Sequence, residues 1–219
     1  MGHRYTRVIL ASCLASAVTM ALAAFAYAAP TPGFIEEFPG SGGTGSFGGG
    51  SILSNPGTGG FLGAGDGYLK VATPAVANLG TNSSGPEYVG NWTSAGVDEV
   101  RLYLNDVGLD EALEIHFLIG TGSNFWSYNT GFAPPNGSWG EFIVPLTGPT
   151  GWTRVIGTGT YADALANADR INIRHDKPPF VQAPDQIKAD FGIDHITLRN
   201  SGATPTVGSS WGRIKHLYR

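Results

Sequence analysis

Polar and aromatic side chains alternate with apolar ones along several short segments, and this pattern could build a carbohydrate-binding surface. Proteins bind sugars by placing aromatic rings against the sugar faces and fixed polar groups beside them. If the segments are neighbours in a sheet, their outward residues would line one face as a shallow groove. The candidate glycan-binding residues are Arg101, Tyr103, Glu114, His116, Asn172 and Arg174, with Trp126 and Tyr128 on one side of a nearby strand. The alternative is an ordinary solvated sheet face, with the tryptophans buried in the core.

Catalysis would need a different arrangement. Hydrolysis of a glycosidic bond uses two carboxylates on opposite sides of the bond, and Glu114 and Glu141 are the acids that could face each other. The sequence contains no Gly-x-Ser-x-Gly, His-Glu-x-x-His or Walker motif. We therefore expect no catalytic residues and keep a glycoside hydrolase as an alternative. We do not expect a zinc or iron site, because no two histidines beyond residue 28 have the close sequence spacing that metal-binding pairs use. These histidines are His116, His175, His195 and His216.

Period-two alternation predicts the strands that must position these side chains. In the segment 100–104, Val100, Leu102 and Leu104 share one face while Arg101 and Tyr103 share the other. Similar runs, separated by Gly, Pro, Asn and Asp, predict strands at 68–71, 113–119, 125–128, 142–146, 152–156, 171–174 and 191–198. The glycine-rich stretch 40–67 predicts loops around one or two short strands, such as 51–53. Many short strands predict an all-β sandwich or barrel, and the alanine-rich segment 161–168 predicts one short helix.

The first 28 residues have the features of a secretory signal peptide. Arg4 and Arg7 give a basic start, an apolar run covers 8–25, and small residues precede a cleavage bond between Ala28 and Ala29. We therefore predict a secreted protein that works outside the cell or at its surface. Cleavage removes Cys13, the single cysteine, so the mature chain would form no disulfide and would depend on its core. No second apolar run is long enough to span a membrane, so we do not expect an integral membrane protein.

Charge divides the chain into an acidic body and a basic end. Removal of the signal leaves 11 basic residues against 17 acidic ones, a net charge of −6. Nucleic acid is not an expected ligand, because binding phosphates requires a basic surface. The predicted organisation is a signal peptide at 1–28, one sandwich domain at 29–200, a spacer at 201–208 and a tail at 209–219.

Several segments carry a family resemblance. They are NWTSAGV at 91–97, WGEFIVPL at 139–146, the alanine-rich stretch 161–168, INIR at 171–174 and DFGIDHITL at 190–198. Together they resemble the laminin-B-type and carbohydrate-binding-module-like jelly rolls of exported bacterial proteins, over about residues 34–200. The resemblance implies a two-sheet, galactose-binding-like sandwich whose first strand, 34–38, lies near a closing strand with an Ile-Asp-x-Ile-x-Leu signature. This fold hosts glycan binders, adhesion modules and enzyme accessories alike.

The same resemblance implies a structural calcium ion. It would bring Glu36 and Glu37 of the first strand together with Asp194 of the closing strand, where related sandwiches often hold calcium. Carboxylate oxygens suit this cation. The alternative is that Asp194 accepts hydrogen bonds from a loop backbone and both glutamates face water.

We therefore expect an exported, non-catalytic module that binds carbohydrate on a cell surface or in an extracellular matrix. The competing hypothesis is a structural surface or matrix protein that has no small ligand and whose sandwich is only a packing unit. Binding to a panel of glycans would separate the two.

The tail at 209–219 is a candidate sorting or attachment segment. An apolar helical stripe is formed by Trp211, Ile214, Leu217 and Tyr218, while Arg213, Lys215 and Arg219 lie mainly off it. A helix this short is only marginally stable in isolation. We therefore expect it to form against a partner, such as an export or anchoring component. The alternative is a frayed end with no role.

Overall fold

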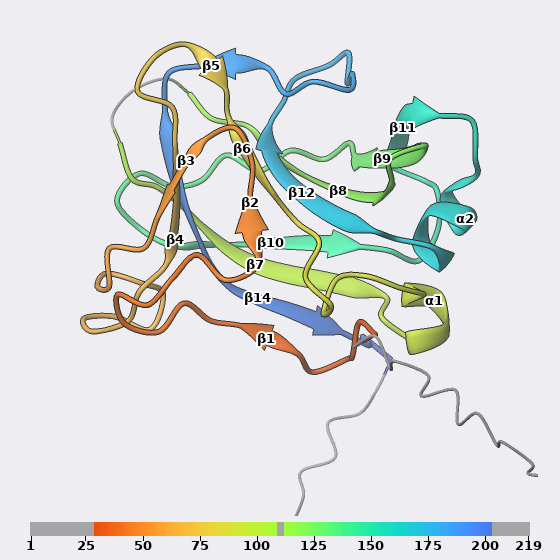
Figure 1. Ribbon diagram of the computed structural model, residues 1–219, viewed down its shortest axis with the longest axis horizontal. Helices are drawn as coiled ribbons and strands as arrows, with labels where there is room; N and C mark the ends of the chain where they lie inside the picture. The colour runs from red at the N-terminus through yellow and green to blue at the C-terminus, as the bar shows by residue number, and fades with distance from the viewer. Residues whose placement is uncertain (1–28, 109–111, 203–219) are drawn as a thin grey trace, which may run out of the picture.

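The alternating segments form strands, and the strands assemble into two antiparallel sheets that pack face to face (Figure 1). The computed structural model describes residues 29–108 and 112–202. Sheet A runs in the spatial order β10 (Gly140–Pro145), β7 (Glu99–Asp106), β14 (Asp190–Arg199), β4 (Leu69–Ala72) and β3 (Ile52–Ser54), with β1 (Ile35–Glu36) also paired to β14. Sheet B runs β11 (Trp152–Gly157), β9 (Asn124–Tyr128), β8 (Ile115–Thr121), β12 (Arg170–His175), β6 (Gly80–Ser83) and β2 (Phe47–Gly48). A separate ribbon pairs β5 (Ala77–Asn78) with β13 (Gln186–Ile187).

The first and last strands are neighbours, as the resemblance implied. Ile35 pairs with Thr197 and Glu36 with Ile196, and β14 also pairs with β7 and β4 at the centre of sheet A. The β14–β7 register shifts between Asp194 and Thr197, and His195 takes a positive φ of 49° there. This irregularity displaces the backbone beside Asp194, a predicted metal ligand.

The core lies between the sheets and follows the predicted alternation. Val100, Leu102 and Leu104 of β7 face Ile115, Phe117 and Ile119 of β8, and all six are completely buried. Trp92 and Trp152 join this core, while Trp126 and Trp139 are half-buried. Burial of this apolar face provides the main force that holds the two sheets together.

Two short helices occur within the described residues. Helix α1 (Trp92–Ala95), which the sequence analysis did not predict, is capped by Asn91, whose side chain accepts a hydrogen bond from the Ser94 amide. Gly96 ends it with a φ of 76°, a left-handed conformation that favours glycine. Helix α2 (Tyr161–Ala166) was predicted and ends two residues before the predicted boundary.

No helix among residues 29–108 and 112–202 has the length and apolarity to cross a membrane. The predicted signal peptide and the tail at 209–219 lie outside the described residues.

Candidate functional site

The predicted glycan-binding residues do not share one sheet face. Strand β7, which carries Arg101 and Tyr103, lies in sheet A, whereas β8, β9 and β12 lie in sheet B. Arg101 pairs with Glu99 at 2.6 Å and with Glu141 at 3.3 Å, and the Tyr103 ring stacks on Phe61 with centroids 3.6 Å apart. The prediction of a single groove is therefore wrong, because these strands belong to two different sheets.

On the outer face of sheet B, His116 and Arg174 are buried rather than open to a ligand. His116 Nδ1 lies 2.7 Å from the Tyr128 carbonyl oxygen, Nε2 lies 3.1 Å from Glu114 Oε1, and the Phe180 ring packs on the imidazole. The Arg174 guanidinium bonds the Asp176 carboxylate and the carbonyl oxygens of the loop that follows β12. These side chains therefore hold that loop against the sheet. They were predicted to contact a sugar, but the loop covers them.

The remaining predicted residues point to both faces of sheet B. Asn172 pairs with Leu118 in register and shares the outer face with Arg174. Trp126 pairs with Ile119, a core residue, so Trp126 and Tyr128 project toward the side of the sandwich interior. Tyr128 packs against Trp152, while Trp126 reaches the end of the sandwich, where it contacts Tyr161 at a ring distance of 5.6 Å.

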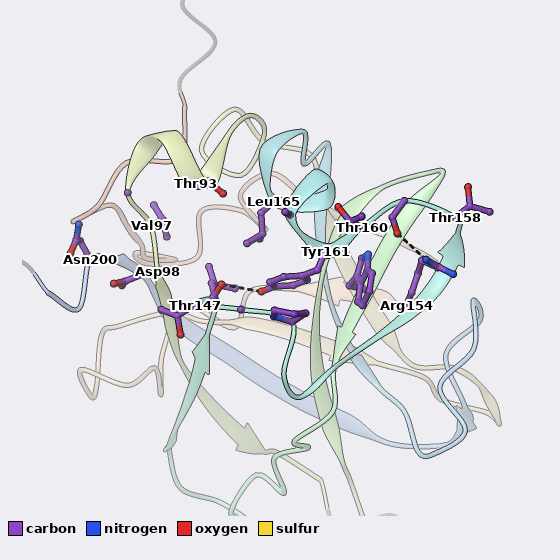
Figure 2. A pocket seen from close by; sticks show the side chains of 17 residues that line it. Thr93, Val97, Asp98, Thr147, Arg154, Thr158, Thr160, Tyr161, Leu165 and Asn200 are labelled. Atoms are coloured by element: carbon purple, nitrogen blue, oxygen red, sulfur yellow. Dashed lines mark hydrogen bonds between the residues drawn. The ribbon is translucent and has the colours of Figure 1, made fainter.

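Trp126 lines a pocket of about 790 Å³ at this end of the sandwich, which we call the end pocket (Figure 2). Its walls come from α1, α2, strands β9 and β11, the β10–β11 and β11–α2 connections, and the residues that precede β7 and follow β14. The side chains that line it are Thr93, Val97, Asp98, Trp126, Leu146, Thr147, Pro149, Arg154, Thr158, Thr160, Tyr161, Ala162, Leu165 and Asn200, with backbone from Gly96, Gly148 and Gly159. Of these lining residues, the sequence analysis predicted only Trp126 as a ligand contact. It missed the others because the pocket joins segments that are far apart in the chain.

Local hydrogen bonds fix the walls of the end pocket. Thr160 caps α2 by accepting a hydrogen bond from the Asp163 amide, and the Asp163 carboxylate accepts one from the Thr160 amide in return. The Arg154 guanidinium donates to the Gly159 carbonyl oxygen at 2.9 Å, which ties β11 to the segment before α2. On the opposite wall, the Asp98 carboxylate accepts hydrogen bonds from the amide and hydroxyl of Ser201.

The lining combines aromatic surface with hydroxyl groups. Tyr161 packs at the inner end of the pocket, and its hydroxyl donates to the Leu146 carbonyl oxygen (Figure 2). Burial raises the pKa of Tyr161 well above its usual range, so the phenol stays neutral. Arg154 lies 5.8 Å from the centroid of the Trp126 ring. Such a lining suits a ligand with apolar faces and many hydroxyl groups.

The two acids considered for hydrolysis lie in different parts of the fold. Glu141 belongs to β10 of sheet A and pairs with Arg101, whereas Glu114 precedes β8 of sheet B and contacts His116. The face-to-face arrangement considered in the sequence analysis is therefore wrong.

The predicted calcium ligands also separate. Glu36 and Glu37 are consecutive in the chain, and their side chains have different neighbours: Glu36 interacts with Tyr88 and Glu87, while Glu37 Oε1 lies 3.5 Å from His195 Nδ1. Asp194 instead meets Asp66, and burial is the main reason that the pKa of Asp194 rises to about 6. Within the described part of the chain, no group of three or more His, Cys, Asp or Glu side chains gathers around one metal position.

Oxygen atoms nevertheless converge beside Asp194. A Cβ atom placed on Gly60 would lie 2.3 Å from the Gly67 carbonyl oxygen, 2.5 Å from Asp66 Oδ2 and 2.8 Å from Asp194 Oδ2. The Phe61 amide donates to Asp194 Oδ2 and the Leu62 amide to Asp66 Oδ2. Two carboxylates and a carbonyl form the donor set that hard cations such as Ca²⁺ prefer, so these residues fit the implied ion.

No protein-family model and no curated protein matches the chain. Among solved structures, an exo-beta-agarase superposes with a TM-score of 0.54 at 15% identity, covering 77% of this chain and 25% of that one. The family 11 carbohydrate-binding module of the cellulosomal cellulase Lic26A-Cel5E of Clostridium thermocellum gives 0.49 at 18% identity, covering 77% of this chain and 96% of the module. The CBM22-1 xylan-binding domain from Paenibacillus barcinonensis Xyn10C gives 0.45 at 13% identity, covering 77% and 96% respectively. At such identities the agarase match supports the β-sandwich fold alone.

Proposed function

We propose that this chain is a non-catalytic carbohydrate-binding module that holds a sugar in the end pocket. The observation that carries the proposal is the lining of that pocket, where Trp126 and Tyr161 lie among the hydroxyl groups of Thr93, Thr147 and Thr158. Sugar rings present C–H faces that pack on aromatic rings and hydroxyl groups that bond with polar side chains. The volume of about 790 Å³ falls within the range of small-molecule sites.

The pocket favours binding over hydrolysis. Asp98 is the single carboxylate among its lining residues, all of which belong to the described part of the chain, and it already accepts two hydrogen bonds from Ser201. Glycosidases of the common type need a second carboxylate across the scissile bond. Export, suggested by residues 1–28, would place this binding activity outside the cell. The likeness to laminin-B-type domains remains a prediction.

Binding can be tested by calorimetry of the full chain against a panel of neutral polysaccharides and their oligosaccharides. Trp126→Ala should weaken binding of a responding sugar by about fivefold or more, because an aromatic platform is lost. Trp139→Ala is the matched control, since Trp139 is also half-buried but bonds the Gly59 carbonyl oxygen over sheet A. Equal losses in both variants would place the site elsewhere, and a panel with no responding sugar would favour a purely structural protein.

We also propose that Asp66 and Asp194 hold a structural calcium ion, with Asp66 in the place that the sequence analysis gave to Glu36 and Glu37. A folded-state ligand stabilises by mass action, about 2.7 kcal/mol when calcium is at 100 times its dissociation constant. Calcium should therefore raise the melting temperature relative to chelator, and Asp194→Asn should remove that increment. Asp169→Asn, which changes an exposed aspartate, should retain it. An identical melting temperature in calcium and chelator would exclude the ion.

A further inference from the structure

The end pocket carries one positive and one negative side chain. Among its lining residues, all of which belong to the described part of the chain, the charged groups are the Arg154 guanidinium and the Asp98 carboxylate. Figure 2 shows them at opposite ends of the cavity, with Asp98 on the side of Asn200 and Arg154 on the side of Thr158. A charged ligand would therefore be attracted to one end of the pocket and repelled from the other.

Arg154 differs from the other arginines within residues 29–108 and 112–202, because no Asp or Glu of these residues forms an ion pair with it. The other arginines each pair with a carboxylate: Arg101 with Glu99 and Glu141, Arg170 with Asp169, Arg174 with Asp176, and Arg199 with Glu99. A guanidinium has several N–H donors, and one of those of Arg154 bonds the Gly159 carbonyl oxygen. Donors and an uncompensated charge therefore remain for a group that the chain does not supply.

Local contacts hold the Arg154 guanidinium at the pocket. Its Nη1 lies 2.9 Å from the Gly159 oxygen, and its Cζ lies 5.8 Å from the centroid of the Trp126 ring. The indole is held in turn, because Trp126 Nε1 donates to Asn124 Oδ1 at 2.8 Å and Asn124 Nδ2 donates to the Thr160 carbonyl oxygen. A guanidinium fixed in this way loses less rotamer entropy when it binds an anion.

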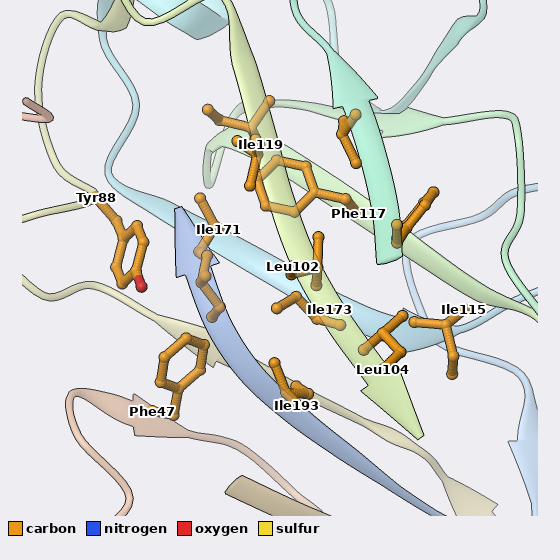
Figure 3. Close-up of a cluster of buried hydrophobic side chains, with 14 of the residues drawn as sticks. Phe47, Tyr88, Leu102, Leu104, Ile115, Phe117, Ile119, Ile171, Ile173 and Ile193 are labelled. Atoms are coloured by element: carbon orange, nitrogen blue, oxygen red, sulfur yellow. The ribbon is translucent and has the colours of Figure 1, made fainter. Parts of the chain in front are cut away.

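The inner wall of the end pocket is apolar. Val97, Leu146 and Leu165 line the cavity and also belong to the core between the sheets, part of which is shown in Figure 3. An apolar wall lowers the local dielectric constant and so strengthens the attraction between opposite charges. At the far end, both oxygens of Asp98 accept hydrogen bonds from Ser201, which fixes a negative charge there.

We propose that the end pocket binds an acidic sugar, with the anionic group on Arg154 and the apolar face of the sugar ring on Trp126. This inference rests on the proposed sugar binding and specifies the class of sugar. A planar guanidinium pairs with a carboxylate through two parallel hydrogen bonds, and it also bonds the oxygens of a sulfate ester. The net charge of −4 on the chain opposes the approach of an acid, so the contact with Arg154 must provide the selectivity.

Calorimetry of the full chain with matched ligands tests this proposal. The ligands are oligosaccharides of mannuronic, glucuronic and galacturonic acid, each beside its methyl ester, and a sulfated galactan oligosaccharide beside its desulfated form. Esterification removes the charge and retains the sugar ring, so an acid should bind about three- to tenfold more tightly than its ester. High salt should reduce this difference. The uronate and sulfate ligands show which anion the pocket accepts.

Variants of Arg154 show whether the preference arises at this residue. Arg154→Gln should weaken binding of the acid much more than binding of its ester, so that the difference between the two ligands disappears. Arg154→Lys should retain part of the preference, because it keeps the charge without the planar fork. Arg170→Gln is the matched control, since Arg170 also lies over an aromatic ring, 5.4 Å from the centroid of Phe125, but does not line the pocket. It should keep the full preference.

Failure of this inference differs from failure of the proposed function. Equal affinity for acids and their esters, lost in Trp126→Ala, would leave a sugar site but overturn the acidic class. A preference for acids that survives in Arg154→Gln would place the anion elsewhere, and equal losses of acid and ester in that variant would make Arg154 a support of the wall; both results would overturn the inference. Tighter binding of a chitosan oligosaccharide than of any acid would overturn it too, because an amino sugar would favour Asp98. No response to any of these ligands would reject sugar binding itself.

Discussion

At the scale of single residues, burial decides whether an arginine or histidine on a strand can reach a ligand. Arg174 and His116 alternate with core residues as sugar contacts would, yet they are 1% and 0% exposed. The loop after β12 covers them, and its Asp176 supplies the carboxylate that Arg174 needs. Alternation predicted the correct outward face of β7, β8 and β12, but it carries no information about a loop that folds back over that face.

Replacement of Arg174 by methionine should cost about 3–5 kcal/mol of unfolding free energy, because it leaves Asp176 buried without its partner. Urea denaturation would measure this loss. Sugar affinity should change little in the folded protein, since Arg174 does not line the end pocket.

Arg101→Met is the comparison, because Arg101 makes ion pairs with Glu99 and Glu141 near the surface of sheet A. Surface pairs contribute about 0–1 kcal/mol, so the loss should be much smaller. If Arg174→Met fails to fold, the double variant with Asp176→Leu should recover stability. Equal losses for the two single variants would contradict the anchoring role of Arg174.

At the scale of elements, the sequence predicted strands with strong alternation and missed those without it. Strands β7, β10 and β12 lie where expected because each carries apolar residues on one face. Strand β6, with the sequence GTNS, has no such pattern and is held by pairing with β12 and β2. Helix α1 has four residues and depends on its caps, a signal too short to separate from a turn.

The capping box of α2 provides a test at this scale. Thr160→Ala removes the side-chain oxygen that accepts from the Asp163 amide, so it should destabilise the protein by about 1 kcal/mol. It should also weaken sugar binding, because α2 forms one wall of the end pocket. Thr160→Ser retains the hydroxyl and should restore most of both properties. Urea denaturation and calorimetry would show whether the two effects occur together, and normal stability in Thr160→Ala would mean that the cap is dispensable.

At the scale of the whole molecule, the end pocket exists because distant segments meet at one end of the sandwich. Thr93 and Asn200 are far apart in the sequence, and both line the end pocket. The period of side chains along a strand cannot reveal such a meeting, which depends on the order of strands in two sheets. The sequence could therefore indicate a sandwich, and sugar binding remains a prediction, while the position of the pocket required the three-dimensional arrangement.

The tail at 209–219 permits a final prediction at this scale. Buried side chains of the described residues 29–108 and 112–202 already form one core between the two sheets, so deletion of 209–219 should leave the melting temperature unchanged. If the tail binds an export or anchoring component through Trp211, Ile214, Leu217 and Tyr218, its deletion should alter where the protein accumulates. Fractionation of producing cells and their medium, with the full chain as control, would measure this. The same distribution and amount for both forms would exclude a sorting role, and a lower melting temperature would show instead that the tail packs on the body.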